Sequence, residues 1–191
     1  MSDLADTIQE SLEHSKESKL NSKIAIMVAI SATIMAICNI KDGNIVQAMS
    51  QAQAHSIDSW SYFQAKSTKQ SIAENSLELL KISPQKNQAV TNQVKRFEDK
   101  ILKYEKEKTE IKNKAEAFEK EYEDLNVFDD QFDMTEAFIS IAIAMLGVTA
   151  LTQKKWLFYF ASTVSISGVL MGLAAFMKIS VHLEWVSKIL G

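Results

Sequence analysis

The sequence predicts an all-α membrane protein in which three transmembrane helices carry a long antiparallel coiled-coil helical hairpin between the first and the second. Four observations support this prediction. Three uncharged apolar runs are long enough to enter a bilayer, and the segment between the first two has a heptad pattern. The only proline, Pro84, interrupts that segment near its middle. With one Pro and five Gly in 191 residues, the chain offers few turn signals of the kind that separate strands.

The heptad pattern is clearest between residues 90 and 125. Its eleven seam positions are Val90, Val94, Phe97, Ile101, Tyr104, Lys108, Ile111, Ala115, Phe118, Tyr122 and Leu125. Only Lys108 is charged, and the positions between are rich in Lys and Glu, so this helix must lie against another helix. The large members of the seam are the expected packing and oligomer contacts: Phe97, Ile101, Tyr104, Ile111, Phe118 and Tyr122.

The first apolar run, residues 24–40, predicts a transmembrane helix at 23–41. It has 17 uncharged residues between Lys23 and Lys41, which is at the short end of what a bilayer requires. A cleaved signal peptide is the competing interpretation. It is disfavoured because the preceding 22 residues contain five acids and no small-x-small cleavage site follows the run. Those polar residues, 1–22, form either an amphipathic helix or a frayed tail.

The hairpin is predicted over residues 42–133. Pro84 lacks a backbone donor and disfavours helix in the residue before it, so the chain is expected to turn there. The two arms, at about 44–81 and 86–125, are nearly equal in length. Equal arms favour an antiparallel hairpin that leaves and re-enters the same membrane face.

Two further transmembrane helices are predicted at 134–152 and 156–177. Asp133 or Thr135 is placed to cap the first of them, and Trp156 suits the membrane interface before the second. Gly168 and Gly172 form a GxxxG pair, and because all three runs carry a face of small residues, we expect the three helices to pack together. Residues 178–191 are expected to form an interfacial amphipathic tail.

The lysines near the membrane ends favour a cytoplasmic N-terminus and a periplasmic hairpin. Lys154 and Lys155, in the short connection between the last two helices, contribute most to this prediction, because short lysine-rich loops stay in the cytoplasm.

Few residues in the sequence indicate catalysis. The three histidines lie in different parts of the chain, and none of the common catalytic or nucleotide-binding motifs occurs, so we expect neither an enzyme nor a cofactor. The middle segment interleaves 14 basic with 17 acidic residues, which gives nucleic acid nothing to bind. No ionisable residue lies inside the apolar runs, which disfavours a proton relay.

Two clusters of side chains are candidate binding sites, one for a cation and one for a partner. Carboxylates at Asp129, Asp130 and Asp133 are candidate cation ligands, but they lack the spacing of an EF-hand loop and suit the front of a helix, so we expect no metal site. Trp60, Tyr62, Phe63 and Lys66 are candidates for binding a partner. Large aromatics at helical spacing equally suit packing against the facing arm.

Four stretches together carry a resemblance to a known family. They are WSYFQAKSTKQS at 60–71, KYEKEKTEIKNKAE at 103–116, DQFDMTEAF at 130–138, and a final pair of apolar helices joined by QKKW at 153–156. In this order after a first apolar helix, they resemble the bacterial family known as domain of unknown function 4337, over residues 22–177. The resemblance implies a bacterial inner-membrane protein and supplies no catalytic residues.

The function expected from these features is a non-enzymatic membrane scaffold that assembles into a homo-oligomeric bundle or cage. A hairpin gives each seam one partner only, whereas Phe97, Tyr104, Phe118 and Tyr122 are large for a single partner helix. The expected partners are membrane lipid, further copies of the chain and an unidentified envelope protein. The alternative is an oligomeric channel or transporter whose pore is lined by uncharged hydroxyls such as Ser31, Thr33, Ser140, Thr149, Ser162 and Ser165.

Overall fold

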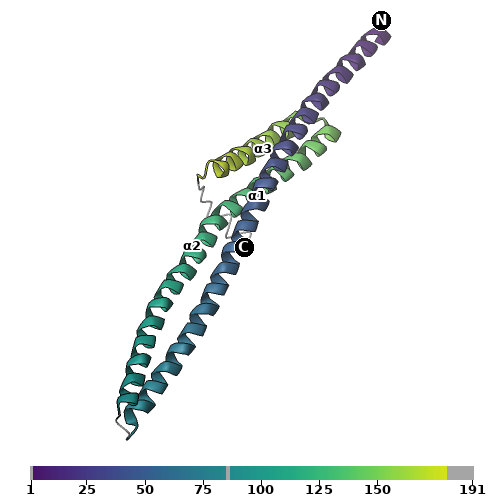
Figure 1. The fold of residues 1–191 in the computed structure, drawn as a ribbon. Helices are drawn as coiled ribbons and strands as arrows, with labels where there is room; N and C mark the ends of the chain where they lie inside the picture. The colour runs from purple at the N-terminus through teal and green to yellow at the C-terminus, as the bar shows by residue number, and fades with distance from the viewer. Residues whose placement is uncertain (1, 85–86, 180–191) are drawn as a thin grey trace. The chain divides into compact units, whose positions relative to one another are not determined.

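Three helices make up the computed structural model, which describes the backbone of residues 2–84 and 87–179 and the side chains from residue 19 onward within those ranges. They are α1 (Ser2–Ile82), α2 (Gln88–Thr152) and α3 (Lys155–Phe176), shown in Figure 1. No strand occurs in the described ranges, so the all-α prediction is confirmed. The side chains of the polar segment 1–18, and all but the first two residues of the predicted tail, lie outside the described residues.

One predicted helix start is wrong. α2 continues without interruption through Asp133 and Thr135, so neither residue caps a new helix. Thr135 is buried, and its hydroxyl donates to the carbonyl oxygen of Gln131 one turn earlier, at 2.9 Å. A threonine that bonds back in this way is satisfied inside a helix and gives the chain no reason to break. α1 likewise continues through Gly43, because a single glycine costs a helix only about 1 kcal/mol.

The chain divides into two compact units, and each is described by itself. Among the described residues, the first unit consists of 2–46 and 126–179. Its core takes residues from all three helices, including the cluster of Ile24, Leu146 and Ala161. The rings of Phe132 and Phe176 meet edge to face at 5.3 Å between centroids. The first unit is therefore a packed three-helix body.

Glycines bring α3 close to the other two helices of the first unit. A Cβ placed on Gly172 would lie 2.9 Å from Cγ2 of Thr135 and 3.2 Å from Sγ of Cys38. On Gly168 it would lie 3.0 Å from Cβ of Phe138. Gly168 and Gly172 therefore pack inside one chain, and the small-residue face of α3 is used within the first unit.

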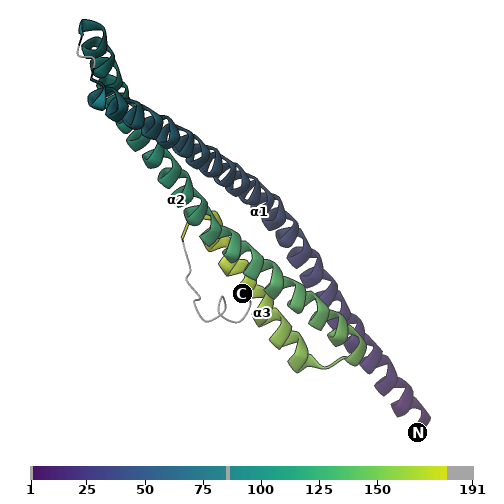
Figure 2. The ribbon, with the colours of Figure 1, turned by 90° about the horizontal axis from the view of Figure 1, so that it is seen from below.

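The second unit, residues 47–125, consists of the end of α1 and the beginning of α2. Figures 1 and 2 show these two segments side by side over their length, running in opposite directions. Pro84 lies in the connection between Ile82 and Gln88. Asn87 caps the start of α2, because its side-chain oxygen accepts a hydrogen bond from the backbone N–H of Val90 at 3.0 Å.

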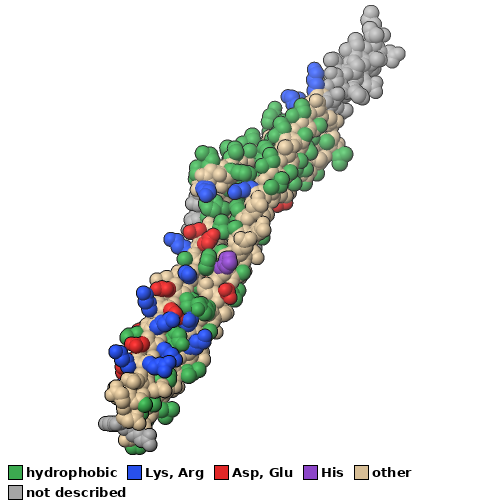
Figure 3. All heavy atoms as spheres, in the orientation of Figure 1, with side chains coloured by type: hydrophobic (Ala, Val, Ile, Leu, Met, Phe, Trp, Pro, Cys, Tyr) green, Lys and Arg blue, Asp and Glu red, His purple; other side chains and the backbone are tan. Residues whose placement is uncertain are grey.

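All three helices are long and apolar enough to cross a membrane by length and composition. In Figure 3 hydrophobic side chains gather on the visible face of the first unit, whereas Lys, Arg, Asp and Glu side chains are scattered over that of the second. The first unit is therefore the part of the chain suited to a bilayer.

The close approach at Gly172 gives a stability prediction. Gly172→Val is expected to lower the free energy of unfolding by about 1–3 kcal/mol, because the added carbons overlap Thr135 and Cys38. The matched control is Gly147→Val, since a Cβ on Gly147 meets nothing within 4 Å. Thermal unfolding of the purified variants in one detergent measures both, and equal midpoints for the two variants would contradict the packing described here.

Candidate functional site

The contact between the two helices of the second unit follows one regular spacing. On α2 all eleven heptad positions, from Val90 to Leu125, are buried or half-buried. On α1 the inward positions recur at alternating intervals of three and four: Met49, Ala52, Ser56, Ser59, Phe63, Lys66, Gln70, Ala73, Leu77 and Leu80. We call these two sets together the arm interface. Alternating intervals of three and four keep one stripe of each helix facing its neighbour.

Lys66 is a charged residue inside the arm interface. Its side chain is only 12% exposed and forms an ion pair with Glu107 of α2. Its amine also lies 5.1 Å from the ring centroid of Tyr62 and 5.5 Å from that of Tyr104. The hydrogen bond to Glu107 raises the pKa of Lys66 and lowers the pKa of Glu107, so both groups stay charged at neutral pH.

Trp60 and Phe63 also contact α2. The indole N–H of Trp60 donates to Oε1 of Glu119 at 2.7 Å. The ring of Phe63 lies beneath the amine of Lys108, 5.2 Å from the ring centroid, which explains how a lysine is accommodated in an otherwise apolar seam. Three of the four candidate partner-binding residues, Trp60, Phe63 and Lys66, therefore contact α2. The fourth, Tyr62, contacts Lys66 within α1 and is 51% exposed.

The predicted packing residues of α2 differ in how fully α1 covers them. Ile111 is buried at 8% exposure, whereas Phe97, Ile101, Tyr104, Phe118 and Tyr122 are only half-buried. His55 of α1 covers part of Phe118, with 5.1 Å between ring centroids. The four aromatic rings of the seam therefore keep some surface accessible beside the arm interface.

A second stripe on α1 contains no charged residue and faces away from α2. Its members are Ile57, Ser61, Gln64, Thr68, Ile72, Asn75, Leu79 and Ile82, and all eight are exposed. Successive members are three or four residues apart, so they lie along one side of the helix. We call this stripe the uncharged face. It extends for about 38 Å at 1.5 Å per residue.

Two of the four polar members of the uncharged face, both hydroxyls, have their donors occupied within α1. The hydroxyl of Ser61 donates to the carbonyl oxygen of Ile57 at 2.9 Å, and that of Thr68 to the carbonyl oxygen of Gln64 at 3.0 Å. Large apolar side chains lie between them, of which Ile72 is 60% and Leu79 is 70% exposed. Covering this face would leave few polar groups without partners. No prediction from the sequence included this face, although the absence of charge at this spacing is visible in the sequence.

The acidic residues Asp129 and Asp133, well inside α2, lie near Asp42 of α1, all within the first unit. Burial, and then the negative charges of Asp129 and Asp133, raise the pKa of Asp42 to about 6. Burial and the charge of Asp133 also raise the pKa of Asp129, while a hydrogen bond from Asp42 acts the other way. Asp130 is exposed and bonds to Asn126 at 3.4 Å.

This cluster has the features of carboxyls sharing a proton. Among the described residues, no group of three or more His, Cys, Asp and Glu side chains is arranged to hold a metal ion. A shared proton relieves repulsion between Asp42 and Asp129 without any cation.

The hydroxyls inside the first unit have partners within the chain. The Oγ atoms of Ser31 and Ser165 lie 2.8 Å apart, in a buried contact between α1 and α3. Those of Thr33, Thr149 and Ser162 each donate to a backbone carbonyl one turn earlier. Ser140 contacts the sulfur of Met35 at 3.5 Å. The contacts of Ser31 with Ser165 and of Ser140 with Met35 join two helices, whereas the other three hydroxyls are bonded within their own helix.

A protein-family model described as "Domain of unknown function (DUF4337)" matches residues 20–178. The chain belongs to this family. The resemblance found in the sequence motifs is thus confirmed, and the DUF4337 match takes in the arm interface and the uncharged face. No curated protein and no solved structure matches the chain. The DUF4337 description assigns no reaction, so the function must be argued from the geometry of the two units.

The proton on Asp42 gives a pH prediction. Between pH 3.8 and about 6 the folded chain holds a proton at Asp42 that the unfolded chain has released, so stability falls as pH rises through this window. Asp42→Asn, which keeps a donor to Asp129 without the charge, should raise the free energy of unfolding at pH 7 by about 1 kcal/mol.

Thermal unfolding at pH 5 and pH 7 measures this effect. In Asp42→Asn, the difference in stability between pH 5 and pH 7 should shrink by the part that Asp42 causes. Asp58→Asn, on the exposed surface of the second unit, is the control and should behave as the unchanged chain does. An Asp42→Asn variant with unaltered pH dependence would show that the proton resides elsewhere.

Proposed function

We propose that this chain is a non-enzymatic scaffold of the bacterial inner membrane. In this proposal the first unit crosses the membrane three times and the second unit is an antiparallel coiled-coil arm on the periplasmic side. Copies of the chain assemble through their arms into a homo-oligomer.

The distribution of polar and apolar side chains in the first unit supports membrane insertion. Its exposed positions carry large apolar side chains, including Ile26, Ile30, Ile37, Ile141, Val148, Leu151, Ile166 and Leu170. Its buried positions include polar side chains, such as Ser31, Gln131, Thr135, Thr149 and Ser165. Exposing that much apolar surface to water is costly, whereas in lipid it costs nothing and the internal hydrogen bonds satisfy the polar groups.

The arm interface supports the coiled coil. Intervals of three and four on both helices, apolar residues at most inward positions and salt bridges such as Lys81 with Glu98 at 3.5 Å are the features of helices that wrap around each other. A third helix beside such a pair would find the half-buried rings of α2 and the exposed uncharged face of α1.

The observation that carries the assembly proposal is the uncharged face. Membrane lipid is not its natural cover, because in this proposal the second unit lies outside the bilayer. A second copy of the chain fits, because a face without charges can meet itself in a two-fold interface without like-charge repulsion. Outside this face and the arm interface, the second unit carries many Lys, Glu and Asp residues, which keep those surfaces solvated.

The mass of the complex extracted in its own lipids tests the proposal. We expect a single defined oligomer. Ile72→Glu places a charge at the centre of the uncharged face and should shift the mass to the monomer, because each interface would then bury carboxylates without partners. Leu102→Glu is the matched control: Leu102 is an equally apolar side chain, 65% exposed on α2 and outside the uncharged face, so this variant should keep the oligomer.

Two outcomes would overturn the proposal. A monomer as the unchanged chain's only species in native lipid excludes assembly, and recovery of the unchanged chain in the soluble fraction excludes insertion. An oligomer that persists in Ile72→Glu while Leu102→Glu dissociates would place the interface on α2 instead.

A further inference from the structure

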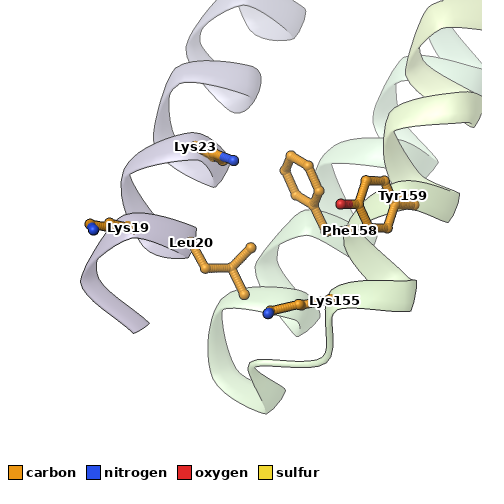
Figure 4. Close-up of a pocket in the computed structure, with 6 residues that line it drawn as sticks. All are labelled: Lys19, Leu20, Lys23, Lys155, Phe158 and Tyr159. Carbon is orange, nitrogen blue, oxygen red and sulfur yellow. The ribbon is translucent and has the colours of Figure 1, made fainter. Parts of the chain in front are cut away.

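A cavity of about 240 Å³ lies in the first unit between α1 and α3. Its walls are Lys19, Leu20 and Lys23 of α1 and Lys155, Phe158 and Tyr159 of α3. Figure 4 shows the amines of Lys23 and Lys155 directed across the opening toward the opposite helix, with Leu20 and Phe158 between the two walls. The cavity therefore combines cationic groups with an apolar lining.

The two walls are linked by a hydrogen bond outside the lining. The side-chain nitrogen of Gln153, in the turn before α3, donates to Oδ1 of Asn21 on α1 at 2.9 Å. Gln153 itself has a left-handed backbone, with φ of 55°, which lets the chain turn sharply from α2 into α3. This turn sets Lys155 opposite Leu20 before any ligand arrives, which lowers the entropic cost of binding.

The positive charge of the lining residues favours an anionic ligand. Within residues 19–84 and 87–179, the four ion pairs involve none of Lys19, Lys23 and Lys155. The lining residues include three lysines and one tyrosine and no carboxylate. The amines of Lys23 and Lys155 point into the opening, whereas that of Lys19 points away from α3 (Figure 4). Ammonium groups and a hydroxyl are suitable donors to a phosphate oxygen.

The position of the cavity points to a lipid as the source of the anion. Lys23 directly precedes the apolar run of α1, and Lys155 begins α3. If both helices span the bilayer, as proposed above, the cavity lies at the level of the headgroups. Trp156 beside it is 65% exposed and Tyr159 is 67% exposed, as is common for aromatic residues at a membrane interface.

We infer that this cavity binds the phosphate of an anionic phospholipid headgroup, with Lys23 and Lys155 holding the phosphate and Leu20 and Phe158 contacting the start of an acyl chain. The inference rests on the proposed membrane insertion. The volume of the cavity lies below that of pockets for drug-sized ligands, which suits a headgroup. Basic pockets between transmembrane helices on the cytoplasmic side bind such lipids. Free phosphate offers the same anion but would leave the apolar part of the lining uncovered.

Native mass spectrometry of the full chain in a neutral detergent tests the inference. Phosphatidylglycerol and phosphatidylcholine are added in turn, and the fraction of lipid-bound protein is measured. We expect phosphatidylglycerol to be preferred, and the double variant Lys23→Gln, Lys155→Gln to lower its affinity at least tenfold, as the loss of two lysines at an anionic surface implies. The matched control changes two exposed lysines of the second unit, Lys112→Gln and Lys114→Gln, and should bind as the unchanged chain does.

Each other outcome overturns part of the inference. Equal affinity in the double variant and the control pair shows that phosphatidylglycerol binds elsewhere. Displacement of the lipid by millimolar inorganic phosphate shows that free phosphate is the ligand. The single variant Lys155→Gln, expected to lose at least threefold in affinity, serves as the test if the double variant fails to fold.

The same spectra separate this inference from the proposed function. They report the mass of the assembly together with the bound lipid. A monomer that retains the lysine-dependent preference for phosphatidylglycerol contradicts assembly alone. An intact oligomer without that preference contradicts the lipid site alone.

Discussion

The alternation of three and four residues between inward positions is the constraint on which the second unit depends. Two helices of this length can stay in contact only if each keeps one stripe turned toward the other, and a residue pattern of 3.5 per turn provides that. The two lysines in the stripes each have a partner on the facing helix. Lys66 pairs with Glu107 and lies over the ring of Tyr104, and Lys108 lies over the ring of Phe63.

In the first unit the helices are held together by close packing at small residues. Its three helices approach closely at glycines, so that Cα of Gly172 faces the side chains of Thr135 and Cys38 directly. Close approach favours dispersion contacts and short hydrogen bonds, such as the one between Ser31 and Ser165. The small residues of α3 are buried in this internal packing, whereas those of the first two apolar runs, such as Ala29 and Gly147, remain exposed.

Sequence patterns alone were enough to predict helical content and the family, because both depend on features that repeat along the chain. The helix start predicted at Asp133 or Thr135 was wrong for a local reason. Capping residues and residues that bond back to the preceding turn are the same types, and only the burial of Thr135 distinguishes the two roles. The contacts of Lys66 could not be predicted either, because the sequence of one helix does not determine which charged residue of another helix its lysine will pair with. The cavity beside Lys23 and Lys155 depends on the turn at Gln153, which periodicity does not describe.

The large side chains of the uncharged face are unevenly distributed, and this has a consequence for how copies would align. Ile57, Ile72, Leu79 and Ile82 are separated by 15, 7 and 3 residues, with small or polar residues between them. Sliding one copy along a parallel neighbour by one heptad, about 10 Å, would bring only Ile72 level with Leu79 and would leave the other bulky side chains without a bulky counterpart. Because these intervals are unequal, two copies would match their bulky side chains in one register and not in the neighbouring ones. An uncharged surface can thus still favour one alignment.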